Sequence, residues 1–166
     1  ATRQIKRVRA GGEVSTVGEV PGVLPGGEGG LLGLAIPPEF EESRWLYAYF
    51  TAAADNRIVR MRYQNGRLGP ADTVFTGIPK GGNHNGGRIA FGPDGMLYAT
   101  AGEAGNPPLA QDRGSLGGKI LRMTPNGQPP RGNPFDNSVV WSYGHRNPQG
   151  IAWDSEAVCL LARQQD

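Results

Sequence analysis

The segment EGGLLGLAI (residues 28–36) is the first of three in which a polar, glycine-rich loop leads into a short apolar strand. The other two are HNGGRIAF (84–91) and RNPQGIAW (146–153). The alanine near the end of each segment recurs after 55 and then 62 residues. Self-similarity at such a period is the signature of a β-propeller or a related repeat architecture.

The repeats also predict where polar residues meet. If each repeat is a blade around a common axis, the loops that precede the inner strands converge near that axis. Glu28, His84 and the pair Arg146–Asn147 hold equivalent positions in the three loops. Residues far apart in the sequence would therefore form one site.

The composition favours sheet throughout. The chain has 27 glycines and 14 prolines in 166 residues, too many helix breakers for long helices and too regularly placed for disorder. We predict an all-β protein with eleven strands. They are 5–9, 14–20, 32–36, 45–51, 56–63, 72–76, 87–91, 97–101, 119–123, 139–143 and 150–154.

The predicted strands make slightly less than three blades at about four strands per blade, whereas a closed propeller has at least about four blades. We therefore expect residues 1–156 to form a partial propeller. Residues 157–166 are predicted to be an atypical tail of truncated or altered sequence. Ala157 stands where the second repeat has the turn glycine Gly95, and the last five residues match nothing earlier.

Charge and motifs exclude several classes of function. The net charge is +2 with scattered Lys and Arg, which is not the footprint of a nucleic-acid binder. No apolar run approaches the roughly 18 residues of a membrane span. A single cysteine excludes an intramolecular disulfide. The first residues do not form a signal peptide, and because the chain opens almost directly on a strand, removal of a targeting segment before this numbering is an expectation. Without P-loop, G-x-G-x-x-G, H-E-x-x-H or G-x-S-x-G motifs, ordinary ATP, NAD and zinc enzymes are disfavoured.

His84 and Glu103 are candidates for acid–base chemistry. His84 lies in a loop with few side chains, where a ligand could approach a natural general base with a pKa of about 6.5. Glu103 follows the strand that pairs with the one after His84, so its carboxylate could bond one ring nitrogen and raise the basicity of the other. The alternatives are a surface-loop histidine bonded to the backbone and a solvated loop acid.

Arg146 and Asn147 lie in GHRNPQG (144–150), the densest polar cluster. A guanidinium suits a carboxylate or a developing oxyanion, and an amide can bond a carbonyl or hydroxyl. Glu28 could accept hydrogen bonds from sugar hydroxyls, although a glycine-flanked acid is often an ordinary loop residue. We assign His145 to structure.

Four motifs in order carry a family resemblance. They are GEGGLLGLA (27–35), HNGGR (84–88) leading to FGPDG (91–95), LGGKILR (116–122) and GHRNPQG (144–150). Together they resemble the soluble glucose/sorbosone dehydrogenases, which include the quinoprotein glucose dehydrogenase and the bacterial aldose sugar dehydrogenases. The resemblance covers nearly all of residues 5–156.

The resemblance implies a six-bladed propeller that binds pyrroloquinoline quinone (PQQ) with Ca²⁺ and oxidises the anomeric carbon of aldoses to lactones. An external electron acceptor and a periplasmic or secreted location are implied in the same way. The residue matching His84 is the base, Glu103 orients it, and Arg146 and Asn147 contact the quinone oxygens. Glu28, Asn83 and Gln149 match substrate-side positions.

Two departures from the family pattern bear on the sugar. Glu28 occupies a position that resembles a substrate-contacting glutamine of the glucose enzyme. Asn83 replaces an acid beside the base. These two differences leave the identity of the preferred aldose open. The carbonyls that hold Ca²⁺ and the basic residues that grip the quinone carboxylates belong to later blades of the family, outside this chain. No metal ligand is therefore assigned here.

Two alternatives remain at this point. One is a Ca²⁺-dependent lactonase-type propeller, for which Glu28, Glu103 and Asn147 are the available ligands. The other is a non-catalytic propeller fragment acting in sugar binding or assembly. A homodimer or a missing C-terminal half could complete the ring, since open sheet edges invite strand pairing.

Overall fold

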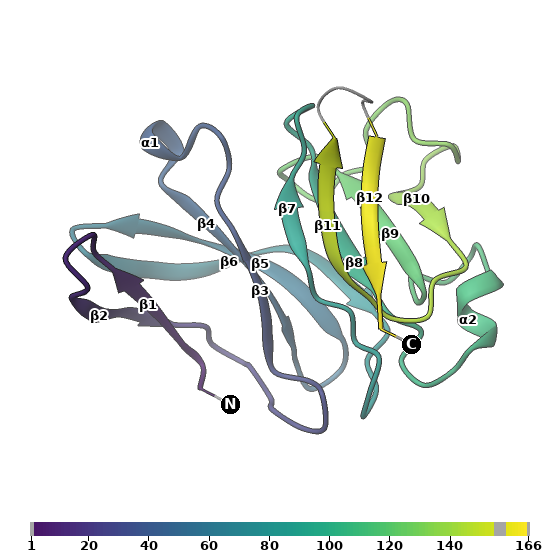
Figure 1. The fold of residues 1–166 in the computed structure, drawn as a ribbon, viewed down its shortest axis with the longest axis horizontal. Helices are drawn as coiled ribbons and strands as arrows, with labels where there is room; N and C mark the ends of the chain where they lie inside the picture. Colours follow the sequence, from purple (N-terminus) through teal and green to yellow (C-terminus); the bar gives the residue numbers. More distant parts are fainter. Residues whose placement is uncertain (1, 155–158, 166) are drawn as a thin grey trace.

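The computed structural model describes residues 2–154 and 159–165, which form antiparallel sheets with two one-turn helices (Figure 1). The strands are β1 (Gln4–Val8), β2 (Val14–Glu19), β3 (Leu31–Ala35), β4 (Trp45–Thr51), β5 (Asn56–Gln64), β6 (Arg67–Ile78), β7 (Ile89–Phe91), β8 (Leu97–Ala101), β9 (Lys119–Met123), β10 (Val140–Tyr143), β11 (Pro148–Asp154) and β12 (Cys159–Gln164). The helices are α1 (Phe40–Ser43) and α2 (Pro108–Gln111). The all-β prediction is confirmed.

Two of the sheets are complete four-stranded meanders. One has the order β3-β4-β5-β6 and the other the order β7-β8-β9-β10, so every strand pairs with its neighbour in the chain. The β1–β2 and β11–β12 pairs flank them as two-stranded sheets. Strands β3, β7 and β11 begin their sheets, and each directly follows one of the three repeated loops. The loops therefore enter equivalent positions, as the repeats predict.

Turn chemistry fixes the hairpins. The β5–β6 turn is Asn65-Gly66, and both residues have positive φ, 50° and 80°. A two-residue turn with this backbone matches the twist of the strands it joins, and asparagine followed by glycine is the pair that tolerates it best. Between β4 and β5 the register runs without a bulge from Trp45↔Arg62 to Thr51↔Asn56.

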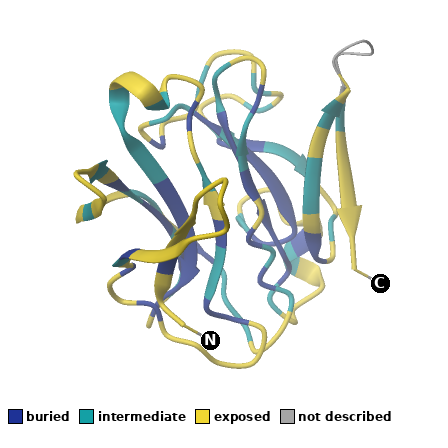
Figure 2. Ribbon diagram, turned by 60° about the vertical axis from the view of Figure 1, so that its left-hand side comes forward, coloured by how far each residue is buried: buried dark blue, intermediate teal, exposed yellow. Residues whose placement is uncertain are grey.

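The apolar core lies between the sheets. One cluster fills the space between the β3–β6 and β7–β10 sheets, where the ring of Tyr47 meets the edge of Phe91 at a centroid distance of 5.1 Å. A second cluster joins β1 and β2 to the other face of the β3–β6 sheet, through Ile5, Val17 and Met61. Figure 2 shows the buried segments running through the middle of the sheets, with exposed loops at their ends. Face-to-face packing of this kind holds neighbouring blades together.

Several elements differ from the predictions. Strand β6 is longer than the predicted 72–76, because the Asn65-Gly66 turn returns the chain directly into pairing with β5. The two short helices were not predicted. Strand β12 was also not predicted, and it pairs with β11 from Pro148↔Gln164 to Asp154↔Cys159. The predicted boundary at residues 156/157, including Ala157, lies outside the described residues.

No helix in the described part of the chain is long and apolar enough to cross a membrane.

Candidate functional site

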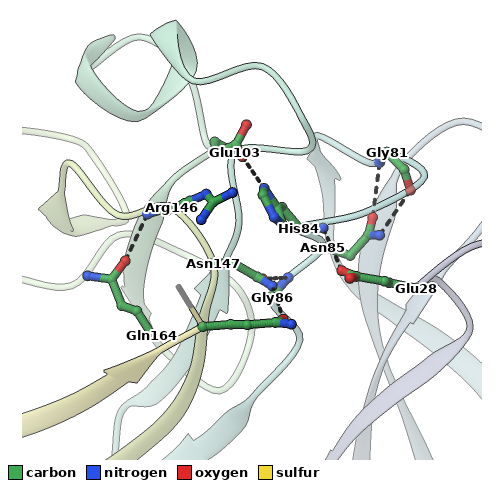
Figure 3. A network of polar contacts seen from close by, with 10 residues as sticks. Glu28, Gly81, His84, Asn85, Gly86, Glu103, Arg146, Asn147 and Gln164 are labelled. Atoms are coloured by element: carbon green, nitrogen blue, oxygen red, sulfur yellow. Dashed lines mark hydrogen bonds and ion pairs between the residues drawn. The ribbon is translucent and has the colours of Figure 1, made fainter.

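The loop before β7 holds His84 in a left-handed conformation, with φ 53°. Its ring is mostly buried, with 13% of the side chain exposed, and Nδ1 pairs with Oε1 of Glu103 (Figure 3). Glu103 follows β8 and its side chain is 2% exposed. The structure thus joins the predicted base and its predicted partner at one end of the β7–β8 hairpin.

The pairing sets the state of the imidazole. A carboxylate only accepts hydrogen bonds, so in the neutral ring this pairing favours the tautomer with the proton on Nδ1 and the lone pair on Nε2. Within the described residues, the second carboxylate oxygen, Oε2 of Glu103, is buried without a hydrogen-bond partner. The carboxylate is therefore directed to a single partner, the ring of His84.

The structure places Glu28 against the backbone of the same loop. Its Oε2 accepts a hydrogen bond from the amide of His84 at 2.8 Å, and its own amide donates to the carbonyl of Gly82 at 2.8 Å. The predicted first and second repeat loops therefore meet. Glu28 is exposed, and its contact in this structure is with the backbone of the base.

Arg146 reaches the site from the third repeat loop. Its carbonyl accepts from the amide of Glu103 at 2.8 Å, and its amide donates to Oε1 of Gln164 at 2.8 Å. Figure 3 shows the guanidinium pointing toward the His84 ring. Among the residues that the structure describes, none forms an ion pair or hydrogen bond with that guanidinium, so its donors remain for a ligand.

Asn147 is a bridge between loops. Its side chain is fully buried, Oδ1 accepts from the amide of Gly86 at 3.0 Å, and Nδ2 donates to Oε1 of Gln165 at 3.0 Å. These bonds fix the third loop against the loop of His84.

The two remaining predicted residues lie at the margin. Asn83 is exposed next to His84. Gln149 is exposed, and its carbonyl accepts from Nε of Arg88 at 3.2 Å. Gln149 lines a small cavity of about 270 Å³ together with Leu32, Arg88 and Arg163. Within the described residues, Gln149 forms no hydrogen bond with the ring of His84.

Gly102 allows the close approach on which the site depends. A Cβ at this position would collide with the carbonyl oxygen of His84 and would lie 3.0 Å from Oδ1 of Asn147. Because the residue has no side chain, the loops carrying His84 and Asn147 can both pack against the end of β8.

Sequence reasoning missed the residues that hold the third loop. Lys119 is fully buried at the start of β9, and its ammonium donates to the carbonyls of Leu109, Ala110 and Gly117 at 2.7, 3.1 and 2.6 Å. Burial lowers the pKa of Lys119, opposed by the charge of Asp112. The segment that Lys119 ties down then bonds the third loop, where the amide of His145 donates to the carbonyl of Gly118 at 3.1 Å.

His145 is structural in its contacts. Nε2 lies 2.7 Å from the hydroxyl of Ser142 and Nδ1 lies 3.3 Å from Nε2 of Gln164. Burial, and secondarily the charge of Lys119, lower the pKa of His145 below its ordinary value. The glutamines that bond Arg146 and Asn147 come from the tail, where no repeat signal could have revealed them.

The described residues contain no group of three or more His, Cys, Asp or Glu side chains placed to hold a metal ion. Glu28 and Glu103 bond different parts of His84, the backbone amide and the ring.

Comparisons with known proteins agree with this arrangement. The sequence model of the glucose/sorbosone dehydrogenase family matches residues 2–164. The chain is 38% identical over 147 residues to the aldose sugar dehydrogenase YliI of Escherichia coli K12, covering 80% of this chain and 40% of that protein. It is 31% identical to the quinoprotein glucose dehydrogenase B of Acinetobacter calcoaceticus, covering 99% of this chain and 42% of that protein.

Among solved structures, the PQQ-bound aldose sugar dehydrogenase of Streptomyces coelicolor superposes with a TM-score of 0.94 at 60% identity, covering 97% of this chain and 50% of that one. A putative glucose dehydrogenase of Thermus thermophilus superposes with a TM-score of 0.91 at 47% identity, covering 97% and 52%. The chain thus spans about half the length of the proteins it matches.

The meandering four-stranded sheets, with polar loops gathered before their first strands, define a β-propeller protein, and this prediction is confirmed. The chain belongs to the glucose/sorbosone dehydrogenase family.

Proposed function

We propose that this chain carries the catalytic base and part of the quinone site of a PQQ-dependent aldose dehydrogenase, which oxidises the anomeric carbon of a sugar to a lactone. The observation that carries the proposal is the His84–Glu103 pair beside the guanidinium of Arg146, which has no partner among the described residues. The names of the relatives, a quinoprotein glucose dehydrogenase and aldose sugar dehydrogenases, support it.

The chemistry assigned to this chain is proton transfer. Nε2 of His84 takes the proton of the anomeric hydroxyl while the C1–H bond gives up a hydride and the C1–O bond becomes a carbonyl. Glu103 stabilises the imidazolium that results, because its buried carboxylate has no competing partner within the described residues. The proton later leaves the imidazolium, which restores the base.

The donors of this chain fit a quinone. When bound, PQQ supplies the two-electron acceptor for the hydride that leaves C1. Arg146 would hold its anionic oxygens with a charged fork. A quinone contact of Asn147 is proposed from the family resemblance alone, because its side chain is fully buried in this structure. We assign no Ca²⁺ ligand to this chain, because the family resemblance places the carbonyls that hold the ion in later blades. An external electron acceptor and a periplasmic or secreted location are part of the same proposal.

The test is His84→Ala in the full-length product of the gene, assayed with PQQ, Ca²⁺, an aldose and a redox dye. We expect kcat to fall by about 10²- to 10⁴-fold, the usual contribution of a general base. The affinity for PQQ should change little, because the quinone contacts are assigned to Arg146 and Asn147. His145→Gln is the matched control, since it removes the other histidine of the chain.

Unchanged sugar oxidation in His84→Ala would contradict the proposal. So would hydrolysis of a lactone by the wild-type protein without quinone as its main activity, which is the outcome that favours a lactonase.

A further inference from the structure

The loop that carries His84 is held in shape by the buried side-chain amide of Asn85. Asn85 directly follows the base and is 2% exposed. Its Oδ1 accepts from the amide of Gly81 at 3.0 Å, its Nδ2 donates to the carbonyl of Gly81 at 2.9 Å, and its own carbonyl accepts from the hydroxyl of Tyr49 at 3.0 Å. The side chain of Asn85 closes the loop on itself, and Tyr49 anchors it from the neighbouring sheet.

A second amide reaches the loop from strand β5. Asn56 is fully buried, and its Nδ2 donates both hydrogens, to Oδ1 of Asn85 at 3.0 Å and to the carbonyl of Pro79 at 2.8 Å. Its Oδ1 accepts from the hydroxyl of Thr51 at 2.7 Å. The loop that carries the base in one blade is therefore bonded through Asn56 to the blade before it.

The conformation of the base explains why such anchoring matters. A non-glycine residue in the left-handed region costs about 1–2 kcal/mol, so the backbone of His84 needs partners to stay there. Its amide donates to Glu28 and its carbonyl accepts from the amide of Ala104 at 3.0 Å. Asn85 fixes the next residue, so a shift there would swing the His84 ring away from Glu103.

We propose that Asn56 and Asn85 are positioning residues that hold the imidazole of His84 in register with Glu103 across the blade boundary. The inference rests on the proposed role of His84 as the base. According to this inference, two buried amides that do not contact the ring of His84 affect the rate.

The competing explanation is that these amides only satisfy buried polar groups and contribute stability. The chain offers a matched control in Asn133, whose Nδ2 also donates to two carbonyls, those of Arg122 at 2.9 Å and Ser138 at 2.8 Å. In the part of the chain that the structure describes, the hydrogen bonds of the Asn133 side chain are with Arg122 and Ser138 and not with the His84 loop. Asn133 is partly buried, and its Oδ1 also accepts from Nη1 of Arg122 at 2.8 Å. Asn56→Ala and Asn133→Ala therefore each remove two donated hydrogen bonds and one accepted hydrogen bond, near to and far from the base.

The experiment compares these variants in the full-length gene product. Histidine side-chain NMR of the quinone-free protein, with the His84 signals identified by their loss in His84→Gln, reports the tautomer and titration of the ring. The charged groups around His84, which are Glu28, Glu103 and Arg146, are unchanged in every variant. We expect Asn56→Ala to change the NMR signature and pH profile of His84 and to lower kcat by about tenfold or more, the usual effect of losing an outer partner. The affinity for PQQ should be retained.

Asn133→Ala should reduce stability without altering the His84 signals. Tyr49→Phe removes only the hydroxyl that donates to the carbonyl of Asn85, and it replaces Asn56→Ala in the experiment if that variant does not fold. We expect a smaller change in the His84 signals and in kcat for Tyr49→Phe than for Asn56→Ala. Wild-type His84 signals and a wild-type pH profile in Asn56→Ala and Tyr49→Phe would overturn the inference. Full activity of His84→Gln would instead overturn the proposed function, while the NMR comparison would still report on positioning.

Discussion

The loop of His84 and the loop of Arg146 hold equivalent positions in successive repeats but are fixed in different ways. In both loops the backbone amide and carbonyl of the residue are bonded and the next residue is buried, but the ring of His84 is also bonded, to Glu103. Arg146 is bonded through its backbone alone, and within the described residues its guanidinium is unpaired. One loop holds its functional side chain in place, whereas the other presents its side chain to a partner.

The difference follows from the chemistry proposed for each residue. A base must already be in the correct tautomer and orientation when the substrate arrives, because an imidazole in any other orientation lowers the rate of proton transfer. A cation that binds an anionic oxygen is oriented by the ligand itself, and a competing partner in the protein would weaken that binding. The predictions below test this contrast between a fixed base and an available cation.

Among the variants that test this contrast, the largest effect is expected for Glu103→Gln. If the new NH₂ faces Nδ1, the ring must move its proton to Nε2, which then cannot accept the sugar proton. If the amide turns the other way, its NH₂ is buried where Oε2 now has no partner. We expect a fall in kcat of about 10²-fold or more, measured by dye reduction, with the affinity for PQQ retained. Wild-type kcat in this variant would show that the pair does not orient the base.

A smaller effect on activity and almost none on stability is expected for Arg146→Gln. The side chain has no partner among the described residues, so the free energy of unfolding should stay within about 0.5 kcal/mol of wild type. Binding of PQQ should weaken by about tenfold or more, since a charge-assisted contact contributes more than about 1.4 kcal/mol. Arg67→Gln, an exposed arginine at the β5–β6 turn, controls for the change in charge.

Titration of PQQ by fluorescence quenching and urea unfolding of the same samples give both quantities. A large loss of stability in Arg146→Gln would show that the guanidinium is a structural group and would remove the contrast between the two loops.

The smallest effect concerns the pH dependence of stability at His145. Burial lowers its pKa in the folded protein, so the unfolded chain binds the proton more tightly. The stability that depends on the neutral ring is fully present above the ordinary pKa of about 6.5 and is lost as the pH falls through the lower folded value. His145→Gln should lose less stability than wild type on going from pH 7.5 to pH 5.5, measured as the shift in the urea midpoint. Identical shifts would mean that His145 does not titrate on unfolding.

Much of the fold followed from local sequence. The strands Trp45–Thr51, Leu97–Ala101 and Lys119–Met123 lie at the predicted bounds, because short β-branched or aromatic runs between turn residues define them without help from distant contacts. The meeting of Glu28, His84 and Arg146 followed from the repeat, because equivalent loops of stacked blades enter the same region.

Other parts could not be predicted in this way. Strand β12 has no counterpart in the earlier repeats, yet Gln164 at its end bonds the amide of Arg146. Asn56 reads in the sequence as an ordinary first residue of a strand, and its bond to Asn85 exists only because two sheets pack together. Such contacts carry no periodic signal.

The sequence by itself determined the β architecture, the positions of the turns and the set of polar residues that meet before the inner strands, since these depend on neighbours in the chain. Only the tertiary structure decided which of those residues are fixed and which are available. A hydrogen bond between loops forms or fails over a fraction of an ångström, and that distance is set by how whole sheets dock.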